Sequence, residues 1–588
     1  MHPSIPFRSI VLLLALGLAG GCAKQAAAPK EAAAPPTAPD TSAAWPAVTE
    51  RFIEDYFKAQ PFFAAQSGRH EFDGQMPDLS AAAIQAEIRR VHAARAAIAA
   101  VDPAGLKSSQ QLEREVLLNV ADRDLFWMEK AQWPFRSPSW YLERLDPDVY
   151  LSREYAPLAQ RMQAYIGYSR AVPAITAAIR ANLKTPLPRP YVEYGIKAFG
   201  GFADFYRKDV PRVFSGVQDA ELQKQLREAN AAAVKAMADL QAWFVQQRSG
   251  ATGDFALGAD LFAQMLKDTE MVDMPVAQIE AAGKADLERN TAALRRECAA
   301  FLPKASLAAC IAKVAADKPK GGVIEAARAQ LGELKSFVQQ HGIVTIPSNE
   351  EALVAQAPPY NASNFAFINI PGPYDHGVAS VYNIAPPDPK WTPAEQAAYI
   401  PGVSTLRMTS VHEVWPGHFL QFLHANANPS KAQSLWVGYA YAEGWAHYCE
   451  EMMIEQGLGA QDPALRIAQI REALLRDVRL LSAIGLHTHG MSVAESEKMF
   501  LEQGFQDVGT ARQQSNRGTR DPGYLNYTLG KLMIRKLRAD WVARQNLPAG
   551  TDERTQWRAF HDQFLSYGGP PIPLVRREML GDNSGPLL

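Results

Sequence analysis

The sequence has no excess of charge of either sign. There are 60 Lys and Arg residues against 62 Asp and Glu residues in a chain of 588, which gives a formal net charge of −2. Proteins that bind nucleic acid need a basic surface that replaces the counterions of the phosphates. We therefore expect no nucleic-acid partner for this chain.

Cysteine is scarce, with four residues in the whole chain. In an oxidising compartment Cys298 and Cys310 could form a disulfide that closes a short loop, which would contribute about 3 kcal/mol. Two buried thiols are the alternative. Cys449 has no evident partner, so we predict that it is a small buried core residue.

Long apolar runs are absent except near the start of the chain. Ile10 to Ala19 form an apolar stretch that is short for a bilayer span, and Arg8 supplies positive charge before it. This pattern predicts a signal peptide over residues 1–21. The small residues before Cys22 resemble the processing box of bacterial lipoproteins, so we predict that Cys22 is lipidated. An ordinary secretory signal with an incidental cysteine is the alternative.

The segment that follows the signal has little that could form a core. Residues 22–46 are rich in Ala and Pro without apolar periodicity, which predicts an extended tether. Ala23 directly after Cys22 is typical of lipoproteins that are sorted to the outer membrane. We therefore predict a periplasmic, lipid-anchored protein whose membrane contact is made by the lipid alone.

From residue 47 to residue 350 the apolar residues follow helical spacing, and segments rich in Pro and Gly separate the stripes. The clearest stripe consists of Leu222, Leu226, Ala229, Ala233, Met237, Leu240 and Phe244. Because small side chains let helices approach closely, the Ala-rich composition predicts a helical bundle over this region.

Between Asn361 and Pro387 the pattern changes to short alternations of aromatic and β-branched residues, NFAFINI and VASVYNI. This pattern predicts a hairpin or small sheet. Helical patterning resumes at Thr392. We therefore predict a mainly α fold with a small β element. Residues 351–588 would form the region of the functional site, either as a separate part or as one continuous body with residues 47–350.

Two histidines lie in an otherwise apolar segment. Val411–Gln421 reads VHEVWPGHFLQ, in which His412 and His418 are six residues apart. On an unbroken helix six residues turn through about 600° and rise about 9 Å. Zinc bonds to histidine nitrogen are only about 2.0–2.1 Å long, so an unbroken helix could not bring both imidazoles to one ion.

A break in the helix would remove this difficulty. Pro416 and Gly417 stand between the two histidines, and Pro disrupts the preceding turn while Gly tolerates unusual backbone conformations. If two residues bulge out, His418 returns to the face of His412. The alternative is that the helix ends near Trp415 and that His418 begins the next element.

A third ligand is available in the segment YAEGWAHYCEE. Glu443, His447 and Glu450 recur there at steps of four and three residues, which places them on one helix face. Glu443 follows His418 by 25 residues, which leaves room for a helix end and an antiparallel return, and we select it as the third ligand. A solvated polar face is the alternative explanation of this stripe.

Taken in order, these motifs resemble the domain-of-unknown-function 885 family. The segments HEVWPGH with LQ, EGWAHYCEE, GLHTHG and YLNYTLGKL look like its signatures, and PFFAAQSGRHEFDG is similar to its amino-terminal region. The resemblance covers nearly the whole mature chain. It implies a bacterial, often lipid-anchored protein related to gluzincin zinc peptidases. In that case a pair of helices would bind Zn²⁺ through His412, His418 and Glu443.

The resemblance also implies a reaction, the hydrolysis of a peptide substrate by a metal-activated water. Glu413 would be the general base and would then pass the proton to the leaving amine. His487 or Tyr527 would stabilise the oxyanion, and His489 competes with His487 for this role. Each of these three residues could equally be structural.

Two features could bind the substrate. Lys531 and Arg538 lie near the helix face of Tyr527, so one of them could bind a substrate carboxylate, although a solvated basic stripe is the favoured interpretation. The predicted strand Val378–Ile384 could present an edge to an extended peptide. Two other functions stay open: a catalytically silent binding or scaffold lipoprotein with a structural metal, and a zinc amidohydrolase that acts on non-peptide amides.

Overall fold

The computed structural model describes residues 41–357, 365–388, 391–581 and 585–588. The predicted signal peptide, the lipidated Cys22 and most of the predicted tether lie outside the described residues. The first described helix begins at Trp45, within the last two residues of that tether. Among the described helices, none combines the length and the apolar character needed to cross a bilayer.

The described part of the chain is mainly helical, as predicted. Its amino-terminal helices are α1 (Trp45–Ala59), α2 (Pro61–Gln66), α3 (Ala81–Ala99), α4 (Ser108–Leu125), α5 (Trp133–Arg136), α6 (Ser139–Leu142), α7 (Asp148–Leu151), α8 (Leu158–Asn182), α9 (Arg189–Lys208), α10 (Val210–Val213), α11 (Ala220–Gln247), α12 (Ala259–Glu270), α13 (Val276–Phe301), α14 (Leu307–Ala316) and α15 (Val323–Gln340).

After the strands the chain is again helical. The helices of this part are α16 (Pro393–Tyr399), α17 (Val403–Glu413), α18 (His418–Asn426), α19 (Lys431–Leu435), α20 (Tyr439–Glu455), α21 (Pro463–Thr488), α22 (Val493–Glu502), α23 (Val508–Arg520), α24 (Asn526–Ala543), α25 (Trp557–Ser566) and α26 (Ile572–Leu580).

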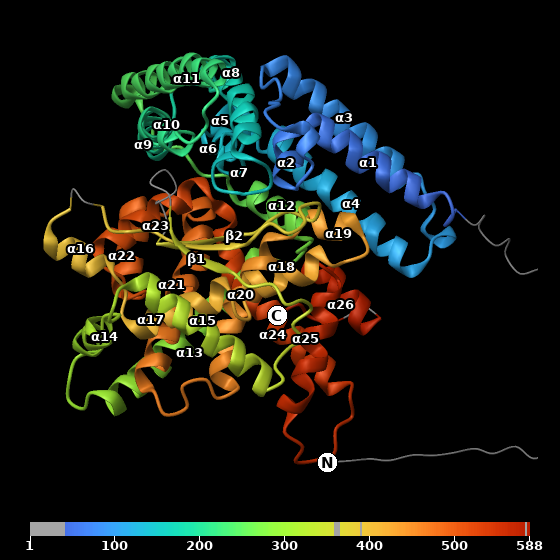
Figure 1. The fold of residues 1–588 in the computed structure, drawn as a ribbon. Helices are drawn as coiled ribbons and strands as arrows, with labels where there is room; N and C mark the ends of the chain where they lie inside the picture. The colour runs from blue at the N-terminus through green and yellow to red at the C-terminus, as the bar shows by residue number, and fades with distance from the viewer. Residues whose placement is uncertain (1–40, 358–364, 389–390, 582–584) are drawn as a thin grey trace, which may run out of the picture. The chain divides into compact units, whose positions relative to one another are not determined.

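Helix α11 shows how the apolar stripe produces the packing. Its predicted stripe is buried from Leu226 to Phe244, while Leu222 at the start of the helix is only half-buried. The carboxylate of Asp219 accepts a hydrogen bond from the backbone N–H of Leu222 and caps the first turn. The buried face packs against α8 and α9, which lie beside α11 at the top of Figure 1.

Of the two alternatives for Cys298 and Cys310, the structure shows the disulfide. Cys298 at the end of α13 is bonded to Cys310 in α14, and both residues are buried. Cys449 is a free, buried thiol, as expected. The bond ties two neighbouring helices together across the short loop between them.

The small sheet is confirmed, but its topology differs from a simple hairpin. The strands β1 (Leu353–Gln356), β2 (Ala366–Asn369) and β3 (Val381–Ile384) are ordered β1-β3-β2, and β3 is parallel to β1 and antiparallel to β2. Val354 and Ile368 both pair with Tyr382. Because β3 is bonded on both sides, it has no free edge, and the predicted peptide-binding edge at Val378–Ile384 is wrong.

The predicted solvated basic stripe on α24 is also wrong. The Lys531 side chain is fully buried and forms ion pairs with Asp286 and Glu451. Arg538 is buried as well, since it donates to the hydroxyl of Tyr448 at 2.8 Å and lies over the ring of Trp557. Neither cation is available to a substrate, because each already has partners inside the protein.

Removing Lys531 should destabilise the protein, because Asp286 and Glu451 would lose a fully buried counterion and would keep the more exposed Arg289 and Arg535. We expect Lys531→Met to cost about 3–5 kcal/mol and to lower the thermal unfolding midpoint. The matched control is Lys536→Met on the same helix, where the ion pair with Asp540 is partly exposed. The control should cost less than about 1 kcal/mol. Equal midpoints for the two variants, measured by scanning calorimetry, would contradict the role of the buried pair.

Candidate metal centre

Helices α17 and α18 are separated by a short break, across which backbone hydrogen bonds such as Trp415 N–H to the Ser410 carbonyl continue. Helix α17 ends at Glu413 and α18 begins at His418, so the expected break is present but is not a bulge inside one helix. The backbone N–H of Gly417 donates to the carbonyl of Val411 at 3.0 Å. A Cβ atom at Gly417 would lie 1.8 Å from the His412 carbonyl oxygen, so only glycine permits this close return.

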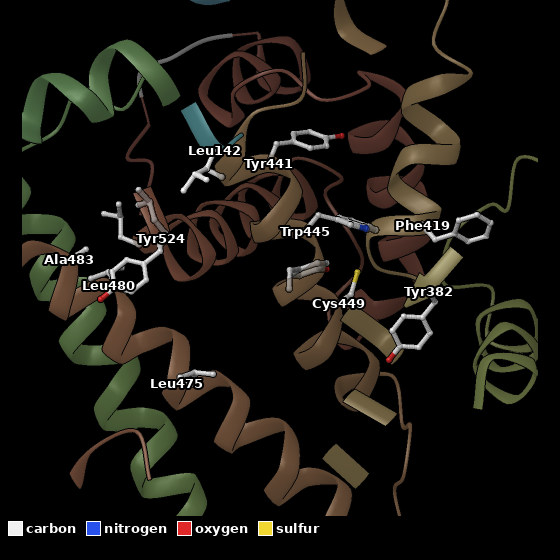
Figure 2. Packing of buried hydrophobic residues seen from close by; sticks show 14 of the residues in the cluster. Leu142, Tyr382, Phe419, Tyr441, Trp445, Cys449, Leu475, Leu480, Ala483 and Tyr524 are labelled. Atoms are coloured by element: carbon white, nitrogen blue, oxygen red, sulfur yellow. The ribbon is translucent and has the colours of Figure 1, made fainter. Parts of the chain in front are cut away.

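Helix α20 fixes this loop from the side. The indole N–H of Trp445 donates to the Pro416 carbonyl at 2.8 Å, and the thiol of Cys449 contacts the same oxygen at 3.6 Å. Figure 2 shows Trp445 and Cys449 on α20 among the buried side chains. The two residues therefore hold the turn at Pro416 against the helix that carries Glu443.

Helices α20 and α24 cross at very short range. A Cβ atom at Gly444 would lie 2.5 Å from the Cα of Gly530, and one at Gly530 would lie 2.1 Å from the Ala440 carbonyl oxygen. Larger residues at this crossing would force the helices apart. The close crossing brings Tyr527 of α24 beside Glu443 of α20.

Three side chains converge on one point. The Nε2 atoms of His412 and His418 each lie 3.3 Å from Oε2 of Glu443, and all three ligand atoms lie within 4.8 Å of one another. In a tetrahedral zinc site with bonds of about 2.0–2.1 Å, neighbouring ligand atoms lie about 3.3–3.4 Å apart. Both distances between an imidazole nitrogen and the carboxylate oxygen therefore match the spacing in a zinc site.

The electrostatics of this triad favour a cation. Burial alone would raise the pKa of Glu443, but the imidazoles of His418 and His412 hold it well below its usual range. Burial lowers the pKa of His412, but the carboxylates of Glu443 and Glu450 raise it to about 9. The negative charges of Glu443 and Glu450 thus lie on either side of the His412 imidazole, where they would stabilise a bound cation.

Glu450 orients the first imidazole. Its carboxylate accepts from Nδ1 of His412 at 2.7 Å, and Arg476 of α21 pairs with the same oxygen at 3.2 Å. When a metal ion displaces the second proton of this imidazole, the proton that stays on Nδ1 is held by Glu450, and the Nε2 lone pair is free on the side of Glu443. A carboxylate in this position fixes the tautomer and the orientation of a metal-binding histidine.

The polar stripe on α20 is therefore not a solvated face. His447 and Glu450 are fully buried, and Glu443 has a side-chain exposure of 19%. Burial and the charge of Lys531 lower the pKa of His447 to about 3, so its imidazole is neutral. The alternative interpretation of the stripe is wrong because this helix lies in the interior.

Tyr527 lies beside the triad. Its ring stacks on the His412 imidazole with the centroids 6.2 Å apart and the planes 14° from parallel. Burial and the charge of Glu443 raise the pKa of Tyr527, so its phenol keeps its proton at neutral pH and can donate a hydrogen bond.

His487 occupies a structural place instead. Its Nδ1 accepts from the backbone N–H of Leu257 at 3.2 Å, and its Nε2 donates to the Gly518 carbonyl at 2.8 Å. Burial lowers its pKa to about 4, which keeps the imidazole neutral. Because backbone groups use both ring nitrogens, the structure does not offer His487 to a substrate. His489 is exposed and lies 3.2 Å from a carboxylate oxygen of Glu280.

Glu413 follows the first histidine at the end of α17 and is half-buried. Among the described residues its carboxylate has neither a hydrogen-bond nor an ion-pair partner. Burial and, to a smaller extent, the charge of Glu413 raise the pKa of Tyr382 in β3. The expected general base is thus next to a ligand and is not engaged elsewhere.

A cavity of about 370 Å³ reaches the triad at Glu443. Its walls come from α4, α12, α20 and neighbouring loops, and apolar and aromatic side chains such as Trp127, Phe422 and Trp436 line much of it. A few polar groups, including Arg123 and Tyr439, interrupt this lining. The cavity can admit an organic molecule next to the candidate metal ligand.

The function of the triad as a metal site can be measured without any substrate. We expect His418→Ala to abolish tight zinc binding. Glu450→Gln should weaken zinc binding by about 10–100-fold, because the His412 imidazole loses its orienting carboxylate. Zinc affinity is measured by competition with a coloured chelator. The control is His489→Ala, which should bind zinc as the wild type does; unchanged affinity in all three variants would contradict the site.

Comparison with known proteins supports the fold. The chain resembles a structure from Shewanella oneidensis, described as a "putative lipoprotein of unknown function", with a TM-score of 0.75 and 23% identity over 91% of this chain and 99% of that chain. It also resembles a "putative lipoprotein" from Colwellia psychrerythraea, with a TM-score of 0.77 and 17% identity over 92% and 98% of the chains. No curated protein matches the chain.

One family model covers most of the sequence. The model described as "Bacterial protein of unknown function (DUF885)" matches residues 61–579. This range includes the whole sheet, the triad and the helices that position it. The chain therefore belongs to the DUF885 family.

Proposed function

We propose that this protein is a lipid-anchored, periplasmic, zinc-dependent metallopeptidase. The observation that carries the proposal is the convergence of His412, His418 and Glu443 on one point, with the free carboxylate of Glu413 next to the first ligand. Two imidazoles and one carboxylate are a ligand set found in catalytic zinc sites, which keep a further position for water or substrate. Other divalent ions also bind such a set, so the assignment of zinc rests on ligand chemistry.

A zinc ion held by this triad would supply Lewis acidity toward a carbonyl oxygen and would lower the pKa of water. The protein's own groups would handle the protons. Glu413 would accept a proton at its carboxylate and return it to the leaving amine. The protonated phenol of Tyr527 would donate to the oxygen that becomes negative in the transition state.

The cavity beside Glu443 supports a peptide or another amide as the substrate. Its apolar and aromatic walls fit side chains of a peptide, and its few polar groups can orient the main chain. A zinc amidohydrolase that acts on non-peptide amides would use the same groups. A mixed peptide library distinguishes the two enzymes, because the peptidase would hydrolyse it and the amidohydrolase would not.

The proposed location rests on the amino terminus. The predicted signal peptide and Cys22 indicate export and lipidation, and the two similar structures are described as those of "putative" lipoproteins. The first described helix begins at Trp45, so the segment from Cys22 to that helix could serve as the tether. Anchoring at the outer membrane would place the metal centre in the periplasm.

The decisive variant for catalysis is Glu413→Gln. It should reduce hydrolysis of a mixed peptide library by about 10²–10⁴-fold, because the proton acceptor is removed. Zinc content and the thermal midpoint should not change. Glu497→Gln, at a carboxylate on α22, is the matched control and should keep full activity. A scaffold protein would show no chelator-sensitive hydrolysis in the wild type, and that result would contradict the proposal.

Tyr527→Phe tests the expected oxyanion donor. Loss of the phenol should lower kcat by about 10²–10³-fold with little effect on KM, because the hydrogen bond strengthens only in the transition state. The measurement is steady-state hydrolysis of one peptide taken from the library. Zinc affinity should stay as in the wild type; a kcat equal to that of the wild type would remove Tyr527 from the mechanism.

A further inference from the structure

Three arginines surround the ring of Tyr527. The guanidinium carbons of Arg476, Arg479 and Arg517 lie 5.9, 4.6 and 5.8 Å from the ring centroid. Arg476 and Arg479 belong to α21, and Arg517 belongs to α23. This much positive charge next to a metal centre requires either counterions or a negatively charged ligand.

Two of the three cations have counterions inside the protein. Arg476 pairs with Glu450 at 3.2 Å and with Glu472 at 2.5 Å. Arg517 pairs with Asp521 at 2.8 Å and donates to the hydroxyl of Tyr439 at 2.9 Å. Because both guanidinium groups have counterions inside the protein, neither needs a negatively charged ligand.

Arg479 is different. Its exposure is 7%, and its Nε donates to the neutral side-chain oxygen of Gln514 at 2.9 Å. Among the described residues no carboxylate pairs with Arg479, and neither of its Nη groups has a hydrogen-bond partner. A buried cation without a counterion is costly, so its retention here calls for a partner that the chain does not supply.

The position of Arg479 connects it to the triad. Its guanidinium lies over the same Tyr527 ring that stacks on the His412 imidazole. The guanidinium carbon lies 4.6 Å and the His412 ring centroid 6.2 Å from the centroid of the Tyr527 ring, so the guanidinium and the imidazole are at most about 11 Å apart. One or two extended residues of a peptide, at about 3.3–3.6 Å each, cover a distance of this order.

We propose that Arg479 binds the carboxylate of the substrate, namely the free carboxyl terminus of a peptide that is cleaved within one or two residues of its end. The two unpaired Nη groups form the planar fork that matches a carboxylate. Lys531 and Arg538, which the sequence offered for this role, are paired internally, and Arg479 takes it instead. This inference rests on the proposed peptidase function and adds a substrate class to it.

The test compares one mixed hexapeptide library in two forms, with free carboxyl termini and with amidated termini. The wild type should hydrolyse the free form with a kcat/KM at least about tenfold higher, because the amide loses a hydrogen bond between two charged groups. In Arg479→Gln this ratio should fall toward one. Arg479→Lys keeps the charge but not the fork and should retain part of the ratio.

Arg471→Gln is the matched control. Arg471 lies two turns earlier on α21 and contacts the Phe505 carbonyl, so its loss should leave the wild-type ratio unchanged. Equal hydrolysis of both library forms by the wild type would overturn the proposal and leave the peptidase function standing, and this measurement does not depend on the folding of any variant.

A binding measurement keeps the two proposals apart. Calorimetric titration of acetyl-Ala-Ala and of its amide should show tighter binding of the acid to the wild type and no such preference in Arg479→Gln. If the library is not hydrolysed at all, the proposed peptidase function fails, and the role of Arg479 as a substrate anchor fails with it. A preference for the acid in the titration would then identify a carboxylate-binding site without peptidase activity. Equal binding of acid and amide would exclude that site too.

Discussion

The return of His418 toward His412 is the constraint on which the proposed site depends. Two imidazoles six residues apart reach one carboxylate because α17 stops at Glu413 and the backbone at Gly417 passes against the His412 carbonyl. The Pro416 carbonyl then accepts from Trp445 of α20, the helix that carries the third ligand. Local backbone geometry and helix packing therefore fix the triad together.

The buried charged side chains around the triad are paired with one another. Glu450 holds His412 and is itself held by Arg476, while Lys531 forms its ion pairs elsewhere in the same interior. Groups of this kind are costly to bury unless they are paired, so their geometry is strongly determined by the fold. Among the described residues of this region, Arg479 differs in that its hydrogen-bond partner is the neutral side chain of Gln514 and no carboxylate pairs with it.

Much of the fold could be predicted from the sequence because it depends on local patterns. Helical periodicity identified α11, and the alternation around VASVYNI identified β3. The added strand β1 was not expected, because its pairing with β3 is a long-range contact between short segments. The same limitation explains the wrong prediction of a free edge at β3.

The candidate ligands were recognisable because the motif and the stripe on α20 carry their residues at fixed spacings. The role of Glu450 was within reach of this reasoning, since it shares a helix face with Glu443. The partners of Lys531, Arg538 and His487 were not, because they come from segments far away in the sequence. Arg479 could not be identified as a binding residue from the sequence either, because it is one of several arginines on a long helix and its neighbours in space come from distant segments.

X-ray absorption spectroscopy at the zinc edge tests the central claim most directly, because it reports the ligand shell of the ion in the purified protein. The account predicts one zinc per chain, bound by nitrogen and oxygen at about 2.0–2.2 Å, with the scattering pattern of two imidazoles. A sulfur shell, a single imidazole, or protein that takes up no zinc would contradict it.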